Sequence, residues 1–154
     1  MPPTTTGYNS TAQADEILTA LSTDLLTLGV SVVTRGRLWV LPVRPCVVLI
    51  GPAIDTTSFS FPQMEGHWTW QVLIARDVGE NEERSEELDI WADTALATIM
   101  DWLIQTGTCE YAGDGPARVE DDALVRLLQH FGERVDATLI QFGTRNPITP
   151  PACP

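Results

Sequence analysis

An alternating run at residues 67–76, HWTWQVLIAR, narrows most strongly the folds that this chain can adopt. Every second position is apolar and large: Trp68, Trp70, Val72 and Ile74. A period of two predicts a β-strand with one face on a hydrophobic core. Since such a face must be buried against another layer, the rest of the chain is expected to supply that layer.

Two segments have the spacing of amphipathic helices. Residues 11–28 follow a capping box made by Ser10 and Gln13, and Gly29 is expected to end this helix in a left-handed conformation. The second helix is predicted to end near Gly107. Its apolar side chains share one side: Leu88, Trp91, Ala92, Ala95, Leu96, Ile99, Trp102 and Leu103.

Short apolar or β-branched runs predict the other strands, at residues 30–34, 37–43, 46–50 and 134–143. Gly51-Pro52 is expected to end the third of these strands. The order of elements predicts an α+β fold: a mostly antiparallel sheet with two long helices packed on one face.

The remaining segments complete the predicted domain organisation. Residues 53–66 are expected to form a long loop, and residues 121–132 a helix, with a strand as the alternative. A single α+β domain is predicted over residues 11–143. It is expected to lie between a flexible N-terminus at 1–10 and a disordered proline-rich tail at 144–154.

The charge of the chain is strongly negative and limits its chemistry. Among 154 residues there are 21 acidic and nine basic residues, all nine of them arginine, for a net charge of -12. This balance disfavours phosphate binding, and the absence of lysine excludes P-loop, Schiff-base and lysine-base catalysis. Neither a leader nor a membrane-spanning segment is expected, and three scattered cysteines favour a reducing cytoplasm.

Residues that commonly carry catalysis or bind metals are sparse. His67 and His130 have no second ligand at metal-binding spacing, and Cys46 in an apolar run is expected to be an inert buried thiol. No serine lies in a nucleophile elbow. We therefore expect no enzyme activity, no metal site and no cofactor.

An acidic stretch separates the strand at 67–76 from the second helix. Residues 77–89, DVGENEERSEELD, lack the residue order of a calcium loop, and acids at a helix start favour the helix dipole. A solvated flank is the main interpretation. Two alternatives are an acidic metal-dependent hydrolase that uses Asp77 and Glu80, or Asp121 and Asp122, and a module that binds basic peptides through its acidic face.

Taken together, the order of segments resembles the tail terminator proteins of long, flexible-tailed bacteriophages. The resemblance covers residues 12–106. It lies in the lengths of the segments and in their patterns of apolar and polar residues. Four segments carry it: ADEILTALSTDLLTLGV, LPVRPCVVLIGPA, WTWQVLIAR and SEELDIWADTALATIMDWL.

This resemblance implies a non-enzymatic virion protein, assembled in the host cytoplasm and placed at the neck, the head-proximal end of the tail. Such proteins form a hexameric ring that caps the tail tube, stops its polymerisation and meets the neck proteins, while DNA passes through the channel. The implied partners are further copies of the chain, the major tail tube protein and head-closure proteins. A head-closure or connector protein, or a tail completion protein, is the nearest alternative.

Within that picture, two sets of residues become candidate sites. Carboxylates at the junction would line the channel and repel DNA phosphates: Asp77, Glu80, Glu82 and Glu83. A ring needs a heterologous interface, and large apolar residues of the 53–66 segment are candidates for contacts with the ring or the tube: Phe59, Phe61 and Met64.

Overall fold

A computed structural model describes residues 10–36, 43–55, 59–60, 63–77, 84–106, 115–119 and 135–148. The helical elements in these ranges are α1 (Ser10–Leu25), the short 3-10 helix η1 (Leu26–Leu28) and α2 (Arg84–Thr106). The strands are β1 (Val32–Arg35), β2 (Cys46–Asp55), β3 (Phe59–Ser60), β4 (Gln63–Asp77), β5 (Ala117–Val119) and β6 (Val135–Ile148).

The strands form one sheet in the order β1-β2-β4-β6-β5, with β3 paired to β4. β1 runs parallel to β2, with Val32 opposite Cys46, whereas the other pairings are antiparallel. The sheet is thus mixed, which corrects the expectation of a mostly antiparallel sheet. Short apolar runs in succession suggest a meander, but strand direction depends on the path of the connection, and apolar spacing does not encode that path.

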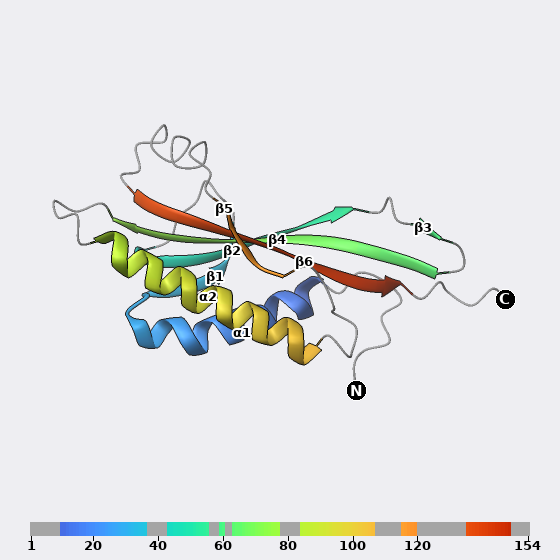
Figure 1. The fold of residues 1–154 in the computed structure, drawn as a ribbon, viewed down its shortest axis with the longest axis horizontal. Helices are drawn as coiled ribbons and strands as arrows, with labels where there is room; N and C mark the ends of the chain where they lie inside the picture. The colour runs from blue at the N-terminus through green and yellow to red at the C-terminus, as the bar shows by residue number, and fades with distance from the viewer. Residues whose placement is uncertain are drawn as a thin grey trace.

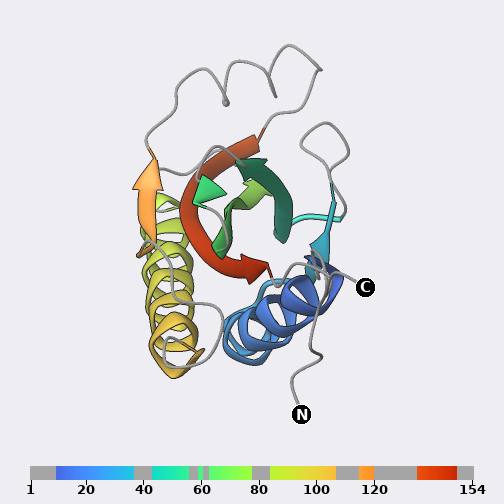
Figure 2. The same ribbon diagram turned by 90° about the vertical axis from the view of Figure 1, so that its right-hand side faces the viewer.

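Both helices cover the same face of the sheet, so the α+β class and the two-helix layer are confirmed (Figure 1). Figure 2 shows the sheet end-on, curled into an arc above α1 and α2. Strand twist and curvature of this kind let a sheet wrap over the apolar sides of two helices.

The alternation that begins at residue 67 places side chains on two separate cores. Trp68, Trp70, Val72 and Ile74 pack with both helices in the larger core. Leu73 and Ala75 point to the opposite face, where they join the buried side chains of Cys46, Val48 and Leu139. The middle of the sheet is therefore buried on both sides.

The first helix ends as predicted, and a polar side chain near its start is buried. Gly29 closes η1 with φ 98°, a left-handed conformation. Gln13 is 1% exposed, and its Oε1 accepts a hydrogen bond of 3.0 Å from Thr144 Oγ1. Thr144 in turn accepts one of 3.1 Å from Trp70 Nε1, so a buried polar chain joins α1, β6 and β4.

β2 passes through Gly51-Pro52 instead of ending there. Its register against β4 shifts between Ile50 and Ala53, which marks a β-bulge. Gly51 has φ 118°, and a Cβ atom at this position would lie 3.1 Å from the backbone oxygen of Thr69. Only glycine suits that combination of backbone angle and close contact.

The strands are also longer than predicted at the end of the sheet that holds β3. Most of the expected 53–66 loop is strand: β2 continues to Asp55, and β3 pairs with the start of β4. β6 continues to Ile148, so residues 144–148 are strand where the disordered tail was expected. In Figure 1 this end of the sheet extends past the helices. Three predicted segments, 1–9, 121–132 and 149–154, and most of 37–43 lie outside the described residues.

Among the described helices, none is long and apolar enough to cross a membrane.

Candidate functional site

The acidic junction lies between the end of β4 and the start of α2. Asp77 is the last residue of β4 and the one candidate channel acid within the described residues. Glu80, Glu82 and Glu83 lie in the 78–83 segment, outside them. The structure therefore locates one end of the junction and leaves these three candidates as predictions.

Asp77 forms an ion pair with an arginine that the sequence analysis did not connect to it. Arg44 Nε donates to Asp77 Oδ1 at 2.5 Å. The Asp77 side chain is 61% exposed, so water screens this pair and its contribution to stability is small. The charge of Asp77 is nevertheless partly offset by its partner.

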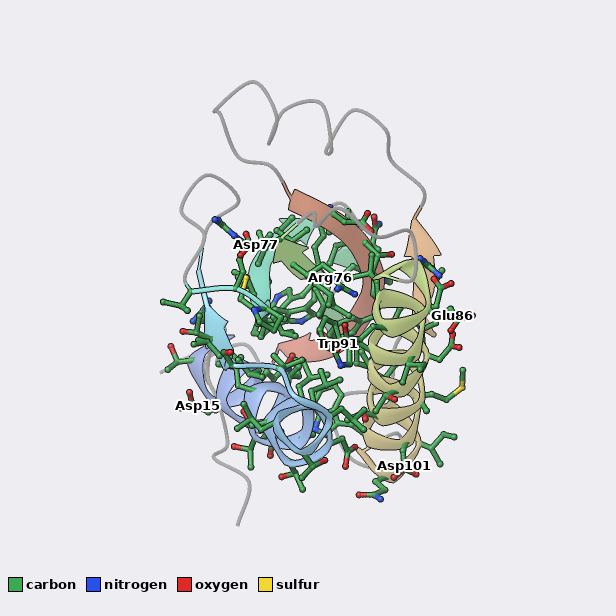
Figure 3. The ribbon with its side chains drawn as sticks, turned by 90° about the vertical axis from the view of Figure 1, so that its left-hand side faces the viewer. Asp15, Arg76, Asp77, Glu86, Trp91 and Asp101 are labelled. Atoms are coloured by element: carbon green, nitrogen blue, oxygen red, sulfur yellow. The ribbon has the colours of Figure 1, made fainter. Side chains whose placement is uncertain are left out.

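Arg76 lies in the interior and not among the acids on the surface (Figure 3). Its Nη1 lies 2.9 Å from Glu87 Oε2, and its guanidinium carbon lies 5.7 Å from the centroid of the Trp91 ring. With 8% of the residue exposed, Arg76 joins the end of β4 to the first turns of α2.

Asp89 makes a similar contact to the sheet. Arg118 on β5 donates from Nη1 to Asp89 Oδ1 at 2.6 Å and from Nε to Thr138 Oγ1 at 2.8 Å. Asp77, Glu87 and Asp89 are therefore paired with arginines of the sheet or of the segment before β2. Three acids of the stretch thus make ion pairs within the fold, a role that the interpretation as a solvated flank did not include.

Other acids of the two helices point to solvent. Three acids lie in α1 and five in α2, whereas the only basic residue of either helix is Arg84. Asp15 on α1 and Glu86 and Asp101 on α2 point outward in Figure 3. The outer surface of the helix layer is therefore strongly negative.

A shallow, open groove lies on this surface where the end of α1 meets α2. Thr98 Oγ1 donates to Asp24 Oδ2 at 2.5 Å and so joins the two helices at the groove. Acidic residues and residues with small side chains line the groove: Asp24, Asp93, Thr94, Ala97, Thr98 and Asp101.

Next to the groove, α2 exposes large apolar side chains that the sequence analysis overlooked. Ile90, Met100 and Ile104 are 54%, 47% and 68% exposed. Together with exposed Ala97 they follow one side of the helix, and we call Ile90, Ala97, Met100 and Ile104 the outer stripe. The signal was present in the sequence, because the spacing of seven from Ile90 to Ala97 to Ile104 is helical and lies off the buried side.

Two of the candidate contact residues, Phe59 and Met64, lie at the end of the sheet that extends past the helices. Phe59 on β3 is directly opposite Met64 on β4, so the structure brings these two together. Phe61 lies outside the described residues. Sequence reasoning assigned all three to a loop, but two of them belong to paired strands.

Residues with catalytic or metal-binding chemistry do not gather in the described part of the chain. Burial raises the pKa of the Cys46 thiol from 9.0 to about 11, so this thiol stays protonated at neutral pH, as expected for an inert cysteine. In the strand register His67 lies opposite Asp55 of β2 and Arg145 of β6. Within the described ranges no three His, Cys, Asp or Glu side chains form a group suited to a metal ion. Asp121, Asp122 and His130 lie outside them.

Comparison with known proteins adds no relative: no protein-family model matches this chain, and no curated protein matches it.

Proposed function

We propose that this protein is a tail terminator, which forms a hexameric ring at the head-proximal end of a phage tail. The ring caps the tube, stops its polymerisation and joins the tail to the neck, and DNA passes through its channel. The observation that carries the proposal is how the four resembling segments fold. They supply α1, β2, β4 and α2, which form the helix layer and the central strands of one unit.

The shape of the sheet supports a ring assembled from copies of the chain. β2, β3, β4 and β6 extend past the helices at one end. β1 pairs only as far as Leu49 of β2, and β5 pairs only with residues 139–141 of β6. Within the described residues, the outer edges of β2 and β6 beyond these points carry no further strand, and two different edges suit a heterologous contact between neighbours.

Phe59, Phe61 and Met64 are the proposed contacts at this end of the sheet. Aromatic and methionine side chains that become buried between subunits commonly dominate the energy of an interface. Replacing all three by serine is expected to abolish capping of tail tubes while the isolated protein keeps its circular dichroism spectrum. A triple variant that still caps tubes would remove these residues from the interface.

The negative charge is consistent with a channel for DNA. Six copies of a chain with a net charge of -12 would repel phosphates, which would keep the duplex from adhering to the wall. Glu80, Glu82 and Glu83 are the proposed lining, with Asp77 contributing less because it is paired with Arg44. If their joint replacement by glutamine leaves the rate of DNA ejection unchanged, they do not line the channel.

Electron microscopy of phage assembled without this protein tests the function itself. Overlong tail tubes are expected, since nothing would stop polymerisation, and supplying the protein should restore tubes of uniform length. Tubes of normal length beside unattached, DNA-filled heads would instead indicate a head-closure or connector protein.

A further inference from the structure

The outer stripe of α2 and the groove beside it form a continuous surface that no described element covers. We infer that this surface docks an amphipathic helix of another protein, with arginines or lysines beside its apolar side. The inference does not depend on the proposed ring, because it rests on the side chains of α1 and α2 alone.

The apolar part of the surface has the length of a helix contact. Ile90 and Ile104 are fourteen residues apart on α2, which corresponds to roughly 21 Å along the helix axis. Met100 and Ala97 lie between them, so apolar contacts are available at each turn or two. Large aligned apolar side chains on a surface mark interaction sites, because their exposure to water is unfavourable.

The shape of the surface favours a third helix over an extended strand. The groove is open and lies where Asp24 of α1 meets α2, and its lining includes Ala97 and Thr98, which are small enough to let a backbone approach closely. A helix laid in such a groove presents side chains at every third or fourth position to both neighbours. An extended peptide would need an open strand edge, and two helices do not offer one.

The charge of the surface selects a cationic partner and disfavours a second copy of the chain. Asp93 and Asp101 on α2 and Asp24 on α1 line the groove. If two copies met through this surface, these carboxylates would face one another and repel. In a cationic helix, the aliphatic parts of arginine side chains would cover Ile90 and Ile104, and their guanidinium groups would reach the carboxylates.

The experiment uses the full chain and a synthetic peptide as the probe. The peptide is a helix-favouring sequence of about eighteen residues with leucines along one side and arginines beside them, long enough to match the stripe. Binding is measured by fluorescence anisotropy at two salt concentrations. A second peptide, with every arginine replaced by glutamate, serves as the negative probe.

Binding of the arginine peptide that weakens as salt is added is the expected result. Ile104→Ser is expected to weaken binding about tenfold, because the most exposed apolar side chain of the stripe is lost. Asp101→Asn is expected to weaken it about threefold and to reduce its salt dependence. Asp15→Asn is the matched control: it removes one charge on the far side of α1 and should change the affinity less than twofold (Figure 3).

Four results would overturn the inference. The first two are failure of the arginine peptide to bind to the wild-type chain and equal binding of the glutamate peptide. The third is a loss of binding in Asp15→Asn as large as in Asp101→Asn, which would indicate attraction by overall charge. The fourth is self-association of the wild-type chain in light scattering that Ile104→Ser abolishes, which would assign the stripe to a contact between copies. Tail tubes of normal length in phage that lack the protein, together with binding of the arginine peptide, would count against the ring alone.

Discussion

The two sides of α2 are both apolar, yet only one contributes to the fold. On the inner side, Trp91, Ala95 and Ile99 are buried against α1 and the sheet. On the outer side, Ile90, Met100 and Ile104 remain about half exposed or more. The difference shows that apolar spacing predicts a contact but does not identify the partner. One side of α2 packs within the chain, and the other is the surface on which we infer that a second molecule docks.

Removing the largest inner side chain should have the largest effect on stability. Trp91 packs in the core, bears the guanidinium of Arg76 on its ring and donates from Nε1 to the carbonyl oxygen of Leu28 at 3.1 Å. Trp91→Ala is expected to lower the free energy of unfolding by about 4 kcal/mol, measured by urea denaturation. A loss below about 1 kcal/mol would contradict the packing described for the inner side.

Trp91→Phe separates the ring of this residue from its hydrogen bond. Phenylalanine keeps most of the packing but leaves the Leu28 carbonyl without the indole donor. We expect a smaller loss, of about 1 to 2 kcal/mol, in the same denaturation experiment.

The buried polar chain beneath the helices is the next largest contribution. Thr144→Val keeps the shape of the side chain but removes the acceptor of Trp70 Nε1 and the donor to Gln13 Oε1. A loss of about 3 kcal/mol is expected, since two buried polar groups lose a partner. Thr144→Ser retains the hydroxyl and should cost much less; equal losses for the two variants would show that the hydroxyl is not responsible.

The opposite face of the sheet carries a second core to which no described helix contributes, and Cys46 reports on its stability. Burial raises the pKa of its thiol from 9.0 to about 11, so the folded protein holds this proton more tightly than the unfolded chain. The associated stability is complete below about pH 9 and is lost as the pH rises to about 11, by about 2 kcal/mol.

Urea denaturation between pH 8 and pH 11 measures this loss. The chain contains no lysine, so the other groups that titrate in this range are two tyrosines, two further cysteines and the N-terminal amine. Cys46→Ala should flatten the decline of stability with pH. A decline of the same size in Cys46→Ala would assign it to those other groups.

Sequence alone predicted the elements that depend on local patterns. The alternation from Trp68 to Ile74 and the helical spacing of both helices correctly identified their buried faces, because each face is determined by the geometry of its own element. Gly29 was likewise predictable, since a left-handed helix end is a local backbone requirement.

The misassigned parts depend on contacts between distant residues. The parallel β1, the continuation of β2 past Gly51 and the strands within 53–66 are stabilised by pairing with neighbouring strands, which a local pattern does not reveal. The ion pairs of the acidic junction also join distant residues: Asp77 and Asp89 contact arginines that lie 33 and 29 residues away in the sequence. By contrast, the outer stripe has a helical spacing that is visible in the sequence, but the larger apolar side of α2 predicts only the buried face.

Polar substitutions in the outer stripe should have the smallest effect on stability, which is the sharpest test of the comparison between the two sides of α2. Ile104 is 68% exposed, so Ile104→Ser removes little buried surface and should change the free energy of unfolding by less than about 0.5 kcal/mol. Urea denaturation measures this change. Ile99→Ala, at an inner residue, is measured in the same way for comparison and is expected to lower the free energy of unfolding by about 3 kcal/mol. A comparable loss for both would mean that Ile104 is part of the core, and the stripe could then not serve as a free docking surface.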